Sequence, residues 1–186
     1  MLHYATDGNT RSREESFEYL LGRDLLIAPV VEEGAIVREV YFPGDDSVEW
    51  VDLKSGRVYK GSTTCVVDAP LLSCGGEENV FAMFGAPIFV QRGGGVVTAG
   101  NSFEGTRHVG AEERNVTIAI SRVKNATARV EWFEDDGASN DYKRGVYDKC
   151  FVRATSDGGD IVRVTKSCSA NVRLPVGDKR QIELVR

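Results

Sequence analysis

Hydrophobic positions near the start of the chain change their spacing over a short distance. Residues 12–21 carry apolar side chains at helical spacing, and Ser12 and Glu15 stand at the separation of a capping box, in which each side chain accepts from the other residue's backbone amide. Gly22 suits the left-handed conformation that ends many helices. Leu25–Ala28 is a continuous apolar run, short enough for a strand covered on both faces. The pattern predicts a helix and then a buried strand, as in an α/β layer.

From Ala35 onward the pattern is that of short strands separated by turns. Residues 43–46, Pro-Gly-Asp-Asp, are a strong turn signal. Residues 100–110 have the composition of a loop and indicate a boundary between two β regions. The expected strands are 36–42, 48–53, 58–59, 63–67, 87–90, 116–120, 128–132, 147–152, 161–164, 172–174 and 182–184. Short strands at this spacing are typical of sandwiches, so we expect a mainly β protein.

Length and charge limit the possible partners. The chain has 186 residues, which suggests one or two domains, and a net charge of −5, which argues against a nucleic-acid partner. No apolar run is long enough to span a membrane, and the first residues lack the basic and apolar regions of a signal peptide. Gly93–Gly95 resembles a phosphate loop only superficially, because no Gly-Lys-Ser/Thr follows, and we expect a turn there. We expect no cofactor.

Cysteines and asparagines point towards an oxidising compartment. Asn115 and Asn125 each begin an Asn-x-Thr tripeptide, the acceptor for N-glycosylation. The chain has four cysteines, which group by position as Cys65 with Cys74 and Cys150 with Cys168. Two disulfides would suit the secretory pathway. Four buried thiols are the other interpretation, because spacing does not prove connectivity.

The densest chemistry lies in residues 131–142, which hold five carboxylates beside aromatic residues. A strand that leaves into an Asp-Gly turn explains the cluster most simply. A calcium site is the second interpretation, with Asp135, Asp136 and Asp141 as candidate ligands, although the spacing is not that of an EF-hand. A glycosidase carboxylate pair is the third, but nothing in the cluster supplies a cleft.

Other candidate chemistry is sparse. The two histidines, His3 and His108, leave few candidates for a catalytic pair, and no Cys-x-x-Cys or histidine cluster indicates zinc. Four aromatic side chains are candidates for stacking on sugars, although alternating aromatic residues in strands more often belong to the core: Trp50, Trp132, Tyr142 and Tyr147.

A set of segments in one order resembles the C-terminal part of glycoside hydrolase family 31, the α-glucosidase and α-xylosidase family. No single segment is specific, but together they cover roughly residues 12 to 150. The matching segments are 17–30 (FEYLLGRDLLIAPV), 33–35, 38–43 (REVYFP), 50–53 (WVDL), 55–61 (SGRVYKG), 69–71, 87–94 (PIFVQRGG) and 133–137 (FEDDG), followed by Ser139, Tyr142, Gly145 and Tyr147.

The resemblance implies a fold and a division into domains. In this family two small β-sandwich domains follow a catalytic (β/α)8 barrel, so residues 25–30 would be similar to the last barrel strand. The expected organisation is therefore residues 1–30 as an incomplete barrel end, 31–99 as the proximal sandwich and 100–186 as the distal one. This chain departs from the family pattern at residues 72–85, where the family has a short link. We interpret the segment as a lineage-specific loop, an extra edge strand or an error in the gene model.

The resemblance also implies a mechanism that lies elsewhere. The family's two catalytic aspartates precede the point where this chain begins, so no catalytic residue is carried over. Two functions stay open. One is a C-terminal part of a secretory-pathway α-glycosidase, with the missing barrel as its partner and a carbohydrate as the parent's substrate, inactive alone. The other is a free-standing β-sandwich module that binds carbohydrate or a protein.

Overall fold

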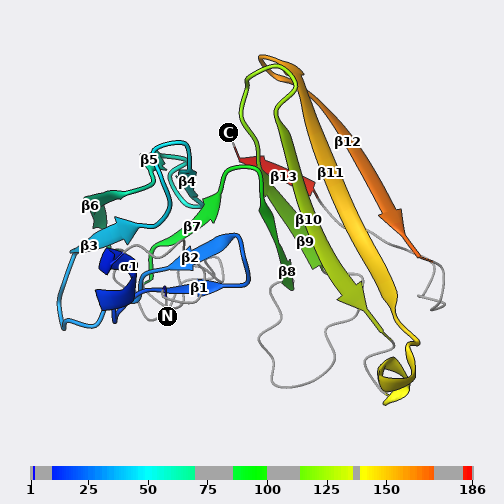
Figure 1. Cartoon of the computed structure of the whole chain (residues 1–186), viewed down its shortest axis with the longest axis horizontal. Helices are drawn as coiled ribbons and strands as arrows, with labels where there is room; N and C mark the ends of the chain where they lie inside the picture. The colour runs from blue at the N-terminus through cyan, green and yellow to red at the C-terminus, as the bar shows by residue number, and fades with distance from the viewer. Residues whose placement is uncertain are drawn as a thin grey trace. The chain divides into compact units, whose positions relative to one another are not determined.

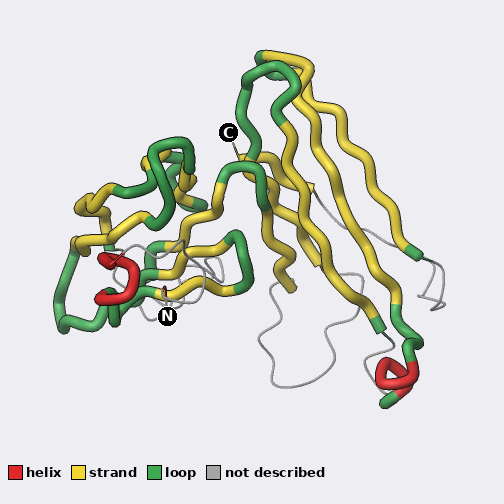
Figure 2. The backbone as a smooth tube through the Cα atoms, viewed as in Figure 1, coloured by secondary structure: helices red, strands yellow, loops and turns green. Residues whose placement is uncertain are grey.

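The computed structural model describes Leu2 and residues 10–69, 86–99, 114–135, 139–169 and 182–185. Most of these residues lie in strands, and the protein is mainly β, as its sequence predicts (Figures 1 and 2). The chain divides into two compact units, Met1–Arg92 and Gly93–Arg186. Domain limits at residues 30 and 99 stay predictions.

Several features expected from the sequence fall outside the described residues. These are the loop-like boundary at 100–110, the segment 72–85, the strand at 172–174, and the residues His3, His108, Cys74 and Asp136.

The first unit contains two sheets. A five-stranded sheet has the order β1-β2-β7-β4-β5, and a two-stranded sheet pairs β3 with β6; all of these pairs are antiparallel. A short helix precedes them. The elements are α1 (Thr10–Glu14), β1 (Tyr19–Leu21), β2 (Leu25–Ile27), β3 (Val37–Phe42), β4 (Glu49–Asp52), β5 (Val58–Lys60), β6 (Thr63–Asp68) and β7 (Ile88–Gln91).

Aromatic rings join the two sheets of the first unit. Phe42 on β3 stacks on Tyr59 of β5 with ring centroids 4.5 Å apart, and it meets Phe89 of β7 edge to face at 4.9 Å. Trp50 is 2% exposed and donates its indole N–H to the Pro43 carbonyl at 2.9 Å. These contacts bury the core of a sandwich, with the indole nitrogen satisfied.

The helix expected over residues 12–21 is wrong. Helix α1 ends at Glu14, and Tyr19–Leu21 is strand β1, which pairs with β2 across a turn in which Gly22 has φ +68°. The capping box is also absent, because Ser12 lies inside α1 and the Glu15 carboxylate accepts from the amide of Phe17 at 3.1 Å. Strand β1 supplies hydrogen-bond partners for the backbone of the buried strand β2. This tertiary pairing overrides the local helical spacing of residues 12–21.

The buried strand itself was predicted correctly. Leu25 and Leu26 are 7% and 0% exposed. Strand β2 lies between β1 and β7, antiparallel to both. In this chain residues 25–27 are therefore an interior strand of the first unit. The similarity of residues 25–30 to the last barrel strand stays a prediction.

The second unit also contains two sheets (Figure 1). One has the order β10-β11-β12 and is antiparallel; the other has the order β13-β9-β8, with β13 parallel to β9. A 3-10 helix at Asp141–Arg144 lies between β10 and β11. The strands are β8 (Gly95–Ala99), β9 (Arg114–Ala119), β10 (Thr127–Glu134), β11 (Asp148–Gly158), β12 (Ile161–Cys168) and β13 (Ile182–Val185).

Alternation along the strands builds the core of the second unit. Every second residue of β10 is buried, and the buried set includes Trp132 at 7% exposure. The core combines side chains from both sheets: Val116, Ile118, Ile120, Ala128, Val130, Trp132, Cys150, Val152 and Ala154. The glycine run forms a turn between β7 and β8, as expected, with Gly93 at φ +96°.

Candidate functional site

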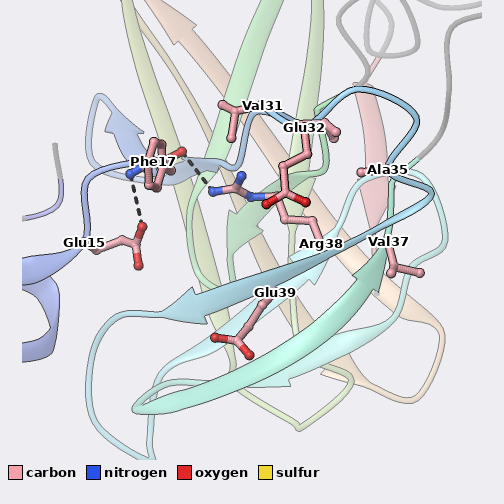
Figure 3. Close-up of a pocket in the computed structure, with 9 residues that line it drawn as sticks. Glu15, Phe17, Val31, Glu32, Ala35, Val37, Arg38 and Glu39 are labelled. Atoms are coloured by element: carbon pink, nitrogen blue, oxygen red, sulfur yellow. Dashed lines mark hydrogen bonds between the residues drawn. The ribbon is translucent and has the colours of Figure 1, made fainter.

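One pocket of the first unit lies where the segment before β1, the segment after β2 and strand β3 meet (Figure 3). Its volume is about 410 Å³. Apolar side chains, three carboxylates and one guanidinium line it. The lining residues are Glu15, Phe17, Val30, Val31, Glu32, Ala35, Val37, Arg38 and Glu39.

Arg38 of β3 joins the segments that form this pocket. Its guanidinium donates hydrogen bonds to the carbonyl of Pro29 and, at 3.1 Å, to the carbonyl of Phe17, the contact drawn in Figure 3. It also lies 3.9 Å from the Glu18 carboxylate. Only 11% of the Arg38 side chain is exposed. One side chain therefore holds both ends of the β1–β2 hairpin against β3, and we call this arrangement the Arg38 joint.

Glu18 is the buried acid of the Arg38 joint. One of its carboxylate oxygens accepts from the amide of Tyr41 at 3.0 Å, and the other has no hydrogen-bond partner within the described part of the chain. Burial raises the pKa of Glu18 to about 7, against the lowering effect of the Tyr41 amide and of Arg38. Desolvation outweighs the nearby cation because the Arg38 guanidinium donates to the carbonyls of Pro29 and Phe17 and stays 3.9 Å from the Glu18 carboxylate. The joint is therefore a structural device with a pH-sensitive carboxyl.

The sequence did not single out Glu18 or Arg38 as functional candidates. Both belong to the segments that carry the family resemblance, 17–30 and 38–43. They are separated along the chain and meet only after β1 folds back onto β2. The signal that could have found them is the presence of two charged residues inside otherwise apolar strand-like runs, since buried charges are usually paired.

The acidic cluster at 131–142 is dispersed by the structure. Asp135 is half-buried at the end of β10, whereas Asp141 begins the 3-10 helix and forms an ion pair with Arg144. Glu134 is buried and accepts from the Trp132 indole at 2.6 Å. No group of three potential metal ligands forms among the described residues. Because Asp136 lies outside them, the calcium interpretation stays untested.

Of the aromatic candidates for sugar stacking, the structure buries two and exposes two. Trp50 and Trp132 are core residues, while Tyr142 and Tyr147 are 45% and 37% exposed. Phe133, which the sequence did not single out, is 61% exposed and meets Tyr147 edge to face at 5.4 Å. The alternation of β10 was the available signal, because it places Phe133 on the other face of the strand from the buried Trp132.

The predicted pairing of Cys150 with Cys168 is present as a disulfide between β11 and β12, with Cα atoms 4.1 Å apart. Cys65 on β6 carries a free, half-buried thiol, and its proposed partner Cys74 lies outside the described residues.

The two glycosylation candidates differ in their surroundings. Asn125 is exposed in the turn before β10, at φ +65°. Its backbone N–H donates to the Ser156 carbonyl at 2.8 Å. Asn115 instead lies within strand β9, opposite Thr98 of β8.

The fold is that of two successive small β-domains, each built from two sheets. More specifically, the chain belongs to glycosyl hydrolase family 31: the family model described as the Glycosyl hydrolase family 31 C-terminal domain matches residues 1–96. No helix in the described part of the chain has the length and apolar character needed to cross a membrane.

Curated and solved relatives agree with this membership. Probable glucan 1,3-alpha-glucosidase of Arabidopsis thaliana is 30% identical over 148 residues, 78% of this chain and 14% of that protein. Neutral alpha-glucosidase AB of Sus scrofa is 28% identical over 181 residues, 97% of this chain and 17% of that protein. The GH31 dextranase of Flavobacterium johnsoniae aligns with a TM-score of 0.60 and 26% identity, over 84% of this chain and 17% of the dextranase.

The chain therefore spans less than a fifth of the length of these relatives. It corresponds to the non-catalytic C-terminal part of family 31 proteins, as its sequence resemblance implies.

Proposed function

We propose that this chain supplies the C-terminal β-domains of a retaining α-glycosidase, whose catalytic barrel hydrolyses α-glucosidic or related bonds, and that these domains alone are inactive. The names of the relatives support the activity class, and the small share of each relative that is matched supports the division of labour. In a retaining enzyme one carboxylate attacks the anomeric carbon and a second acts as acid and then base. We assign neither role to this chain.

The observation that carries the proposal is the outward surface of the β1 hairpin. Phe17, Tyr19 and Leu21 stand at alternate positions, and their exposed fractions are 59%, 38% and 58%. Strand β1 is the outermost strand of its sheet. Apolar side chains gathered on one exposed strand are typical of a surface that packs against another domain. We therefore assign this strand to the contact with the barrel.

An enzyme assay tests the division of labour. Purified 186-residue protein is expected to leave nitrophenyl α-glucoside and nitrophenyl α-xyloside intact, whereas a longer protein from the same gene that carries the barrel hydrolyses one of them. Turnover by the 186-residue protein would refute its inactivity.

A second assay tests the barrel contact within the longer protein. Leu21→Asp is expected to lower its stability and activity, since a charge would be buried at the contact. Val66→Asp on β6 is the matched control, because Val66 is 65% exposed in the same unit and its replacement costs little. Equal effects of the two substitutions would contradict the assignment of β1.

The free-standing binding module is the second candidate function. Its support is the exposed pair of Phe133 and Tyr147 in the second unit. Retention of the 186-residue protein on an immobilised neutral glucan, abolished by Phe133→Ala, would favour this candidate. Passage through the column without retention favours the accessory role alone.

Passage through the secretory pathway forms the last part of the proposal. The disulfide between Cys150 and Cys168 and the exposed sequon at Asn125 support it. Expression in a eukaryotic secretory host is expected to add a glycan that enzymatic deglycosylation removes, and Asn125→Gln is expected to abolish the corresponding mass shift. An unmodified secreted protein would contradict glycosylation at this site.

A further inference from the structure

The outer face of the sheet β10-β11-β12 carries a surplus of positive charge, although the whole chain is acidic. Four cations project from this exposed face against two carboxylates. The cations are Arg129, Lys149, Arg153 and Arg163, and the carboxylates are Glu131 and Asp157. The chain as a whole has a net charge of −5. The local reversal of sign therefore needs a physical explanation.

Two of the arginines face each other directly. Arg129 of β10 and Arg153 of β11 are register partners, so their side chains leave the same face from opposite positions. Like charges at directly opposed positions destabilise a sheet. Arg163 of β12 adds a third guanidinium one diagonal step away, since its register partner is Thr155 and that of Arg153 is Thr165.

The available carboxylates do not neutralise this group. Glu131 is shared between Arg129 and Lys149, whose ammonium lies 3.1 Å away, and these hydrogen bonds and charges lower the pKa of Glu131. Asp157 pairs with Arg163 at 3.0 Å. Arg153 has no acidic partner among the described residues. An external anion placed between Arg129 and Arg153 would remove the repulsion and receive two charge-assisted contacts.

Aromatic surface continues along the same face. The Arg129 guanidinium lies over the ring of Phe151, 4.7 Å from its centroid, which holds the side chain across β11. Phe133, further along β10, forms its exposed pair with Tyr147, which directly precedes β11, and the Lys149 ammonium lies 5.9 Å from the Phe133 centroid. Phe133 lies four positions along β10 from Arg129, a span of about 13 Å. Basic and aromatic surfaces therefore follow one line.

We propose that this basic-aromatic face binds an acidic polysaccharide, whose carboxylate or sulfate groups lie between Arg129 and Arg153 while a neighbouring sugar ring rests on Phe133. The three arginines supply the charge, and the aromatic pair supplies an apolar surface for the ring. An acidic polysaccharide fits both features at once, because it repeats anionic groups and rings along an extended chain. The inference rests on family membership and on this sheet, and is independent of the parent's activity.

Affinity electrophoresis of the 186-residue protein tests the proposal. Migration is compared in gels that contain dextran sulfate, polygalacturonate or neutral dextran. We expect retardation by the two polyanions, weaker retardation as salt is added, and none by neutral dextran. Arg153→Gln is expected to weaken polyanion binding about tenfold, corresponding to one lost charge-assisted contact.

Matched variants separate the site from net charge. Arg122→Gln removes the same charge from an exposed arginine of the same unit, which pairs with Asp160 at 3.7 Å, and is expected to change binding less than about twofold. Phe133→Ala is expected to weaken binding to the polysaccharides but not to free sulfate. Thermal unfolding of Arg153→Gln should be unchanged or shifted upwards, because repulsion is relieved.

Three outcomes would overturn the proposal. They are the absence of retardation by either polyanion, equal losses in Arg153→Gln and Arg122→Gln, and equal or tighter binding of poly-glutamate or of single-stranded DNA. The last outcome would assign the face to an acidic protein segment or to a nucleic acid instead.

Discussion

In the first unit the longest strands, β3 and β6, have six residues each, whereas β11 in the second unit has eleven. Short strands form few ladder hydrogen bonds, so the first unit depends on contacts between distant segments. These are the ring cluster of Phe42, Tyr59 and Phe89, and the Arg38 joint. The second unit is held by long alternating strands and by a disulfide. The comparison shows two ways in which small sandwiches compensate for limited cores.

The chain contains a convenient reporter for each unit. It has two tryptophans, Trp50 in the core of the first unit and Trp132 in the core of the second. Variants with Trp132→Phe or Trp50→Phe leave a single indole, whose fluorescence follows the unfolding of one unit. In each prediction below the other unit serves as the internal control.

Loss of the ring cluster is expected to have the largest effect. Phe42 is fully buried, and Phe42→Ala should lower the free energy of unfolding of the first unit by about 3–5 kcal/mol. Denaturant unfolding monitored at Trp50 measures the change. Phe17→Ala is the control, since Phe17 is 59% exposed and its loss should cost about 0.5 kcal/mol or less. Similar costs for the two variants would contradict the assigned core.

Loss of the disulfide is expected to affect the second unit. Cys150→Ser with Cys168→Ser removes a bridge across 18 residues and should cost about 2–4 kcal/mol, as monitored at Trp132. Cys65→Ser should leave that transition in place, because Cys65 belongs to the first unit. An unchanged second-unit midpoint in the double variant would show that alternation alone holds this sheet.

Glu18 gives the first unit a pH dependence of its own. Burial raises the pKa of Glu18 from 4.5 to about 7, so the folded unit favours the protonated carboxyl. The resulting stabilisation is fully present below the pKa of the unfolded chain, about 4.5, and is lost as pH rises through about 7. The cost at alkaline pH approaches about 3 kcal/mol. Glu18→Gln should flatten this part of the stability profile at Trp50. Parallel profiles for the two proteins would show that Glu18 titrates normally.

Gly95 provides the smallest of these effects. A Cβ at this position of β8 would lie 2.5 Å from the Thr117 carbonyl oxygen and 3.2 Å from the Cβ of Val130. Gly95→Ala should therefore push β8 from its neighbours and cost the second unit about 1–3 kcal/mol. A measurement at Trp132 that shows no loss would mean that the strands give way freely.

The sequence predicted most strands of both units, but it missed β1 in the first unit and β8 in the second. The alternation of β9 and β10 reports directly which side chains face the core. The positions of Cys150 and Cys168 suggested a pair but left buried thiols as an alternative, and the structure shows the disulfide. In the first unit the helical spacing of residues 12–21 was misleading, since Tyr19 and Leu21 alternate outward from a strand whose partner is β2. Only the tertiary pairing decides between these periods.

The candidate sites were harder to predict than the fold. The Arg38 joint needs the hairpin to close, and the opposed arginines need the register of β10 on β11. The sequence shows Arg129 and Arg153 as isolated cations far apart along the chain. Family resemblance did identify the accessory role, because it depends on ordered motifs rather than on contacts.

Strands β11 and β12 are joined at both ends. The turn at Gly158 and Gly159 connects one end, and the bond between Cys150 and Cys168 closes the other, so the two strands form a covalent ring. Strand β12 is the outermost strand of its sheet, and such strands usually fray from an open end. Here no end is open, so the ladder must break in its middle or all at once. The β12 amide protons that donate to β11 should therefore exchange with solvent more slowly than is usual for an edge strand.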